Sequence, residues 1–364
     1  MATAAILYLY RDCHKAAMMR PLWLATLAAV SACASSSCSL SASGPITITA
    51  DNSLIENLLI RSAAAGGDAV HVEGASNVTI RNVRIEHAPS GRGIFFQQAP
   101  GINISGVEIV AVAQASAPLR GANNCSLPNK DCDNILGQSS TGVTISRVRL
   151  DGGSTGVELA DCPLALVEYV SARNNRGPFP RGQCVQFTHS DGALLQDFGC
   201  FNDNTSWTED NVNIWRSSNV TVRRGVVDGN NSPTGVGVMF EMSDNETSGG
   251  ILEDVDALHQ GDGCFSGYSA RGLSMSRTRC AHNHCTGWAG RGKPTSNSLM
   301  WAAGDELGIR SEGVIVRDSQ YFAMCNPTNV HWEASKGGFA GDTVDAVEQE
   351  FAPRKQPHVV MCWE

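Results

Sequence analysis

Short alternating patterns of apolar and polar residues recur along the chain and predict many short β-strands. In each four-residue copy the first and third positions are mostly apolar, as in Val157-Glu-Leu-Ala160 and Val212-Asn-Ile-Trp215. Because alternate side chains of a strand share a face, we expect positions one and three to point into a core and positions two and four to point away from it. Further copies begin at Val70, Ile94, Val185, Val238, Cys264, Leu299 and Val330, and a copy at Ile135 fits less well.

A second pattern of a small residue, Asn or Gly, and alternating apolar positions runs through the same stretch, for example at Ser76–Val83 and Ser218–Gly225. In most of the chain the unit repeats every roughly 22 to 28 residues, and longer steps indicate loop insertions. A repeat of this length with two or three strands favours a solenoid whose coils stack on one another. The pattern therefore predicts an all-β parallel β-helix of about ten coils, with loop insertions on one face.

Composition supports this class. Hydrophobic residues make up 42% of the chain and charged residues 17%, which suits a globular protein with a sizeable core. The 37 glycines and the low aromatic content of 6% favour strands joined by turns. The signature of leucine-rich repeats and the period of about 40 residues of a propeller are both absent from the sequence.

Rungs such as Ser217-Ser-Asn-Val-Thr-Val222 resemble those of the right-handed parallel β-helix proteins of the pectin lyase-like superfamily, over roughly residues 45 to 335. The resemblance implies that fold, together with activities that include polysaccharide lyases, glycoside hydrolases of the polygalacturonase kind, uronan epimerases and adhesins. It concerns the fold and assigns no role to a single residue.

The chain divides into a targeting segment at 1–42, a β-helix domain at 43–341 and a C-terminal tail or cap at 342–364. An apolar run of ten residues after Arg20 is typical of a secretory signal and is too short to span a bilayer. Met18 and Met19 are alternative start sites. We expect a secreted protein, or one that is lipid-anchored through Cys33 if the source is bacterial.

Charge and cysteines narrow the partners and the compartment. The formal charge of -9 argues against nucleic acid and anionic lipid as partners, and we expect a monomer without a transmembrane segment that binds polysaccharide. Ten cysteines in the exported body favour disulfides, and sequons such as Asn124 and Asn204 imply glycosylation on loops if the source is eukaryotic, whereas we expect Asn77 to be a turn residue. The sequence leaves the pairing open, with short loops at Cys125/Cys132 and Cys280/Cys285 and a longer one at Cys325/Cys362 as candidates.

The second and fourth positions of the middle coils carry hydrogen-bonding groups and an aromatic ring, which are the partners that sugar hydroxyls and pyranose faces require. Because the coils stack, we expect these side chains to form one surface, flanked by loop residues that precede the strands. The expected substrate-binding residues are Glu158, Gln186, Asn213, Trp215, Glu241, Trp207, Trp288 and Arg181.

The same loops contain candidates for acid, base and metal chemistry. Arg291 and Lys293 are two cations separated by one residue, and they could supply the cationic partner of the uronate carboxylate and the base that β-elimination requires. Asp210 and Glu241 could hold Ca²⁺. Asp210 and Asp262 occupy equivalent places in their coils and would suit an inverting hydrolase. The full set of expected catalytic residues is Lys293, Arg291, His259, Asp262, Asp210 and His284.

The prediction is therefore a secreted polysaccharide lyase that acts on uronans by β-elimination, with Ca²⁺ as a possible cofactor. Two alternatives stay open. The first is a glycoside hydrolase of the polygalacturonase type, and the second is a carbohydrate-binding or adhesin protein without catalysis. The usual paired Asp and His-Gly elements of polygalacturonases are missing, which places the lyase slightly ahead.

Overall fold

The computed structural model describes residues 38–63, 66–112, 131–177, 181–203, 206, 208–230, 232, 235–242, 248–261, 263–281, 300–303, 309–322 and 339–364. These residues form β-strands joined by turns and loops, and none of them lies in a helix. Within these ranges there is accordingly no apolar helix of membrane-spanning length. The predicted all-β class is confirmed.

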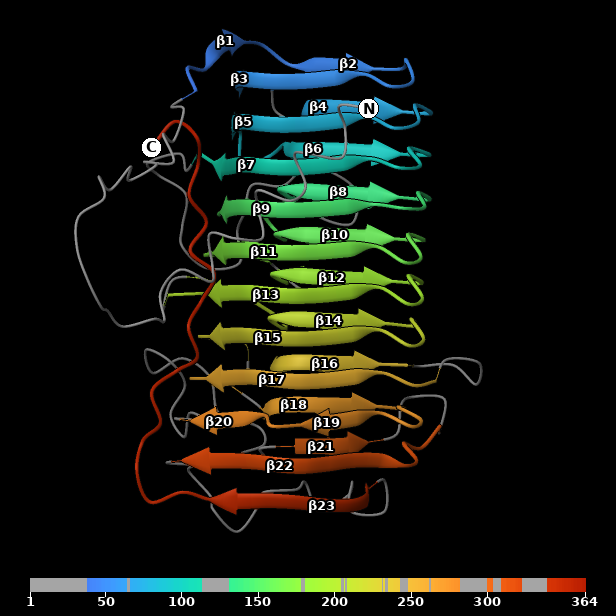
Figure 1. The fold of residues 1–364 in the computed structure, drawn as a ribbon, viewed down its shortest axis with the longest axis vertical. Coiled ribbons are helices and arrows are strands. Elements are labelled where there is room, and N and C mark those ends of the chain that lie inside the picture. Colours follow the sequence, from blue (N-terminus) through green and yellow to red (C-terminus); the bar gives the residue numbers. More distant parts are fainter. Residues whose placement is uncertain are drawn as a thin grey trace, which may run out of the picture. The chain divides into compact units, whose positions relative to one another are not determined.

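The strands stack into two parallel sheets that follow the chain from the first coil to the last (Figure 1). Sheet A has 13 strands and sheet B has 10, and from β1 to β18 successive strands along the chain belong alternately to the two, so that each coil contributes to both. Sheet B consists of β2 (Ile46–Ile48), β4 (Asp68–Glu73), β6 (Arg92–Gln97), β8 (Ile135–Gln138), β10 (Val157–Ala160), β12 (Val185–Thr188), β14 (Val212–Trp215), β16 (Val236–Glu241), β18 (Gly263–Tyr268) and β21 (Met300–Ala303).

Sheet A is built from longer strands, in which each coil again pairs in parallel with the next. Its members are β1 (Ser41–Ser43), β3 (Leu54–Ser62), β5 (Thr79–His87), β7 (Asn103–Ala111), β9 (Thr144–Asp151), β11 (Leu166–Arg173), β13 (Leu194–Phe201), β15 (Thr221–Asp228), β17 (Ile251–Leu258), β19 (Ser274–Ser276), β20 (Arg279–Ala281), β22 (Val314–Phe322) and β23 (Phe339–Ala346).

One residue in each long strand of sheet A has left-handed backbone geometry and interrupts the ladder. Asn82 has a φ of 53° and Asp254 a φ of 56°, and the paired registers skip both positions. Asn and Asp tolerate this conformation better than other residues with a side chain. The break divides each strand into two extended pieces, so every full coil has three, as the predicted two or three strands per repeat require.

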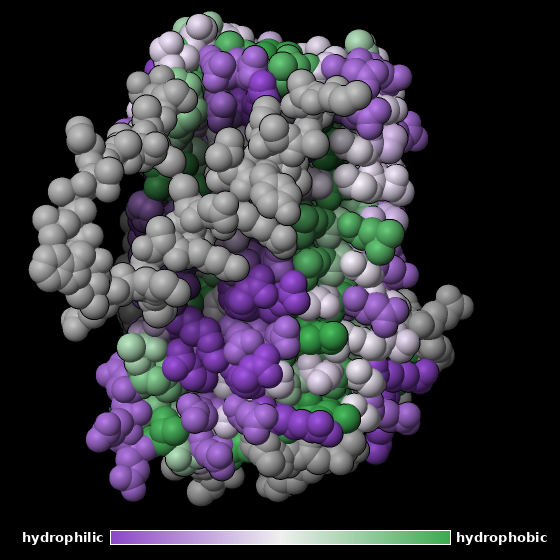
Figure 2. Space-filling view, in the orientation of Figure 1, coloured by the Kyte–Doolittle hydropathy of each residue, from purple (hydrophilic) through white to green (hydrophobic). Residues whose placement is uncertain are grey.

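Apolar side chains from both sheets fill the interior along the whole stack. The largest fully buried ones include Phe96, Phe187, Phe198, Phe240 and Phe265. They stand at the first or third position of their strands or at the corresponding inward positions of sheet A, which confirms the expected alternation. By contrast, hydrophilic side chains cover much of the face drawn in Figure 2.

The coil at Ile135 belongs to the helix although its pattern is weak. Gly137 stands where other coils carry a large apolar residue, and the ring of Phe96 from the preceding coil fills the space. Two later coils were misplaced by one residue. Val238 pairs with Phe265 and Phe265 pairs with Met300, so the copies predicted to begin at Cys264 and Leu299 begin one residue later. Consequently Ser266, and not Phe265, occupies the second position there, and Phe265 points into the core.

The described disulfides include two that close short loops and one that joins residues far apart in the sequence. Cys184 pairs with Cys200, and Cys264 pairs with Cys280, so the expected link between Cys280 and Cys285 is wrong. Cys362 pairs with Cys38 and not with Cys325, across a separation of 324 residues. Cys132 is also disulfide-bonded, whereas buried Cys162 is a free thiol. Disulfides persist in oxidising compartments, and the chain therefore fits an extracellular protein.

The C-terminal segment after β23 runs back along the ends of the sheet A strands toward the first coils (Figure 1), and its Cys362 pairs with Cys38 ahead of β1. Arg354 forms ion pairs with Asp256, whose side chain is fully buried, and Glu364 accepts from Arg149. Phe351 packs under the guanidinium of Arg279 at 4.4 Å. The disulfide thus joins the two ends of the described chain, and the ion pairs hold the C-terminal segment against strands β17 and β9 of sheet A.

We expect Gly137→Ala to lower the free energy of unfolding by about 1 to 3 kcal/mol, because a methyl group there would meet the Phe96 ring and Leu159 in a closely packed core. The matched control is Gly44→Ala, since nothing lies within 4 Å of the added methyl group. Chemical denaturation of both variants measures the difference. Equal stability of the two variants would contradict the packing described for this coil.

Candidate functional site

The register of sheet B brings polar side chains of consecutive coils into two columns. In the first column Glu158 pairs with Gln186 and Gln186 with Asn213. In the second, Trp215 pairs with Glu241 of the next coil. Neighbouring coils lie about 4.8 Å apart, so these residues form one continuous surface, as the sequence predicted. Their role in binding stays a prediction.

These side chains point away from the core and yet are largely buried. Glu158 is 5% exposed, Gln186 7% and Asn213 3%. Buried polar groups normally have hydrogen-bond partners, but one oxygen of Glu158 and the amide oxygen of Asn213 have none. Polar atoms in this state favour a ligand that supplies the missing contacts.

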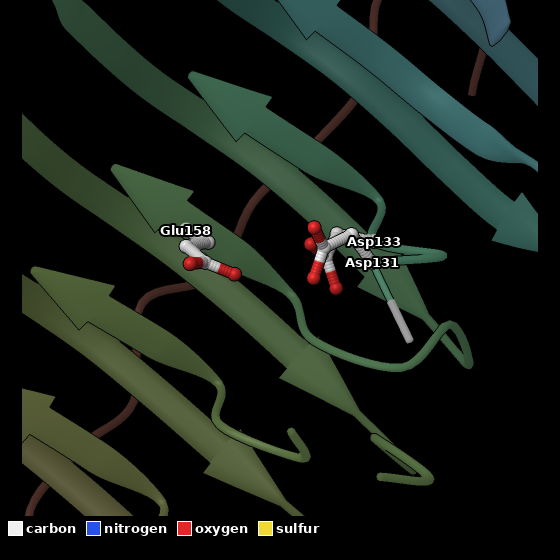
Figure 3. Close-up of side chains that lie close together, drawn as sticks. All are labelled: Asp131, Asp133 and Glu158. Atoms are coloured by element: carbon white, nitrogen blue, oxygen red, sulfur yellow. The ribbon is translucent and has the colours of Figure 1, made fainter. Parts of the chain in front are cut away.

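Three carboxyl groups meet at the start of this surface. Asp131 and Asp133 lie in the loop that leads into β8, and Glu158 comes from β10 of the next coil; Figure 3 shows its carboxyl group pointing toward the two aspartates. Each residue offers one oxygen, and these oxygens all lie within 4.8 Å of one another. We call these three residues the carboxylate cluster.

The sequence did not point to Asp131 and Asp133. A signal was present, because Asp131-Cys-Asp-Asn134 precedes β8 much as Glu209-Asp-Asn211 precedes β14. The weak alternation of the Ile135 coil concealed it. The cluster shares no member with Asp210 and Glu241, whose expected Ca²⁺ role stays a prediction.

Arg181, an expected substrate-binding residue, contacts the carboxylate cluster. Its Nε and Nη2 both donate to Oδ1 of Asp131, at 2.9 and 2.7 Å, and its Nε lies 3.3 Å from Oε2 of Glu158. Nη1 donates to Oε1 of Gln186 over 3.4 Å. Only 12% of the side chain is exposed, so solvent screens these contacts weakly.

Burial dominates the electrostatics of the cluster. It raises the pKa of Asp133 to about 6, although Arg181 and the hydrogen bonds from Ser154 and Thr155 act in the opposite direction. Burial, followed by repulsion from Asp133, raises the pKa of Glu158 to about 8. Glu158 therefore keeps its proton near neutral pH, because its pKa lies above 7.

A second acidic group lies two coils further on, around Asn213. The Nδ2 of Asn213 donates to Asp210 at 2.8 Å and to Glu241 at 3.3 Å. Glu209, which the sequence analysis did not single out, accepts from Gln183 at 3.0 Å. Burial and then repulsion from Glu241 raise the pKa of Glu209 to about 7. Burial and then repulsion from Glu209 raise the pKa of Asp210 well above its ordinary value.

Two further expected residues have contacts of their own. His259 lies at the end of β17, and its Nδ1 is 2.7 Å from Oδ1 of Asp228 in the neighbouring strand β15. The ring of Trp215 contacts the His189 ring at 5.4 Å between centroids, and the Arg216 guanidinium lies over it at 4.8 Å. A sugar face would have to share the indole with these neighbours.

Several expected residues fall outside the part of the chain that the structure describes, so their positions are not assigned. This holds for both cations proposed for the lyase reaction and for two of the three tryptophans proposed as sugar platforms. They are Arg291, Lys293, Asp262, His284, Trp207 and Trp288.

We expect Glu158→Gln to stabilise the protein increasingly as the pH rises. A pKa raised from 4.5 to about 8 means that the folded state binds this proton more tightly than the unfolded state, so the wild type loses stability between these pH values. Glutamine does not ionise, and the gain should vanish near pH 4.5 and reach on the order of 4 kcal/mol at pH 8.

Thermal unfolding with divalent cations removed by a chelator measures this gain. The matched control is Glu168→Gln, which removes a half-exposed carboxyl group on β11 that accepts a hydrogen bond from Gln196. A gain for Glu158→Gln that is the same at both ends of the pH range would contradict the assigned cause.

Comparison with known proteins agrees with the fold. Residues 30–177 match the family model described as "Right handed beta helix region". No curated protein sequence matches the chain.

Solved structures similar to this chain include an alginate lyase from Paenibacillus sp. str. FPU-7, with 10% identity, 83% of this chain and 99% of that chain covered and a TM-score of 0.49. The A-module of the Azotobacter vinelandii mannuronan C-5 epimerase AlgE6 has 10% identity, coverage of 86% and 92% and a TM-score of 0.44. The catalytic domain of a GH87 α-1,3-glucanase has 7% identity, coverage of 84% and 63% and a TM-score of 0.44. At such identities the similarity concerns the fold alone.

Proposed function

We propose that this right-handed parallel β-helix protein of the pectin lyase-like type is an extracellular enzyme that cleaves a uronan by β-elimination at the carboxylate cluster. The observation that carries the proposal is the set of three carboxyl groups within 4.8 Å of one another, with Arg181 reaching them from the coil of β12. β-Elimination requires positive charge at the uronate carboxylate, because the proton beside it is removed in the reaction.

The carboxylate cluster has the chemistry of a calcium site. Ca²⁺ prefers oxygen ligands and tolerates irregular coordination, and all three residues offer carboxylate oxygens. One oxygen of Asp133 and one of Glu158 are buried without a hydrogen-bond partner. Asp131, Asp133 and Glu158 would therefore hold the ion. When bound, Ca²⁺ would supply positive charge that acidifies the C5 proton of a uronate nearby.

The other parts of the reaction fall to residues along the same surface. Arg181 can bind a uronate carboxylate through its planar fork, and Asn213 and Gln186 can accept hydroxyl groups of neighbouring sugars. Lys293 and Arg291 stay the proposed base and its partner. Glu209, with its pKa raised to about 7, is suited to protonate the oxygen that leaves C4.

Hydrolysis is the second candidate, and the second acidic group favours it. Glu209 and Asp210 are adjacent carboxyl groups that both keep protons at higher pH than usual, as a general acid requires. Trp215 and Glu241 pair across neighbouring coils beside them. A sugar stacked on that indole would lie close to the acid.

A panel of uronans and neutral glycans, incubated with the protein in Ca²⁺ or in a chelator, separates the two. Lyase action gives unsaturated ends that absorb ultraviolet light and requires Ca²⁺. Hydrolysis gives reducing ends without that absorbance, and binding without either product indicates an adhesin.

We expect Asp133→Asn to lower the Ca²⁺-dependent lyase rate by about 100-fold or more, since it removes a ligand charge from the cluster. The matched control is Asp161→Asn, an exposed residue in the turn that follows β10, which should keep the wild-type rate. Uronan cleavage that is equally fast in the chelator would contradict the lyase proposal.

A further inference from the structure

The guanidinium of Arg181 already holds oxygens that a cation in the carboxylate cluster would use. Two of its N–H groups donate to the same oxygen of Asp131, and its Nε is 3.3 Å from Oε2 of Glu158. That Oε2 is one of the buried oxygens without a hydrogen bond, so the contact is an ion pair of imperfect geometry. A cation at these oxygens and the guanidinium would repel each other at close range.

Arg181 alone leaves the cluster unbalanced. Three carboxyl groups face one guanidinium. Asp133 is fully buried, and its Oδ2 has no hydrogen-bond partner. The carboxyl group of Asp133 lies beside that of Asp131, the carboxyl group of Glu158 points toward both (Figure 3), and one oxygen of each lies within 4.8 Å of the others. Among the described residues no second guanidinium contacts the cluster, and a divalent ion prefers oxygen ligands of the kind that its three residues offer.

Building on the proposed function, we propose that Arg181 is an internal counter-ion that competes with a divalent cation for the carboxylate cluster and is drawn away by a uronate carboxylate of the substrate. Cation and uronate then bind cooperatively, each tightening the other. The reciprocity follows from linkage, because both act on one equilibrium, the position of Arg181.

The surroundings of Arg181 allow this exchange. Its Nη1 already faces Gln186 in the outward column of sheet B, away from Asp131. The fork of N–H groups that now meets Asp131 suits a free carboxylate equally well, but it cannot serve both at once. When a cation replaces the guanidinium in the carboxylate cluster, Arg181 thus becomes available to the carboxylate of a uronate bound over β12.

Calorimetric titration with Ca²⁺ alone, at neutral pH, tests the competition. We expect Arg181→Gln to bind Ca²⁺ about tenfold more tightly than the wild type or better, because a positive charge next to the ion is removed. Arg181→Lys keeps the charge and should bind like the wild type. Arg176→Gln, from the same loop, controls for the loss of a nearby arginine, and Asp133→Asn should abolish binding in both backgrounds. Wild-type or weaker affinity in Arg181→Gln would overturn the proposal.

A second titration adds short oligomers of alginate or polygalacturonate, at saturating concentration, before Ca²⁺. We expect at least one of the two oligomers to tighten Ca²⁺ binding by the wild type and neither to do so in Arg181→Gln. If Arg181→Gln binds Ca²⁺ more tightly but neither oligomer changes the wild type, the exchange with substrate is overturned. Failure of the proposed function looks different, since the glycan panel then gives no unsaturated ends while the calorimetric results with Ca²⁺ alone stand.

Discussion

The in-register stacking of coils is the constraint on which the rest of this structure depends. Each strand of sheet B pairs in parallel with the next, first position with first position. A residue's place in its coil therefore decides which residues lie above and below it. Backbone hydrogen bonds and the buried apolar side chains of both sheets hold that register. Side chains that are far apart in sequence, such as Glu158 and Asn213, are thereby brought into one column.

Stacking also explains the unusual electrostatics of the site. Like-charged side chains at neighbouring places in successive coils cannot separate without breaking the ladder, and burial removes the water that would screen them. The result is a row of carboxyl groups with raised pKa values at Asp133, Glu158, Glu209 and Asp210. Burying like charges close together costs stability, and carboxyl groups with strongly raised pKa values are typical of functional sites. Arg181 lies between the two acidic groups and lowers the pKa of both Asp133 and Glu209.

Much of this arrangement could be predicted from the sequence, because alternation and repeat length are local signals. They were sufficient for the fold and for the two columns of sheet B, one with Glu158, Gln186 and Asn213 and the other with Trp215 and Glu241. What the sequence could not give depends on exceptions to the repeat. Gly137 hid the coil that carries Asp131 and Asp133, since its core space is filled by Phe96 from another coil. The one-residue displacement at Cys264 has the same origin, because register is set by pairing with β16 and not by the local pattern. Disulfides such as that between Cys38 and Cys362 depend on where the chain returns, which no spacing encodes.

The most direct test of the account is a crystal structure of the protein grown with Mn²⁺, as an anomalously scattering substitute for Ca²⁺, and a uronate oligomer. The account predicts an anomalous peak coordinated by Asp131, Asp133 and Glu158, with the sugar chain crossing β10, β12 and β14 and its carboxylate on Arg181. A metal peak elsewhere, or an oligomer bound along sheet A, would contradict it.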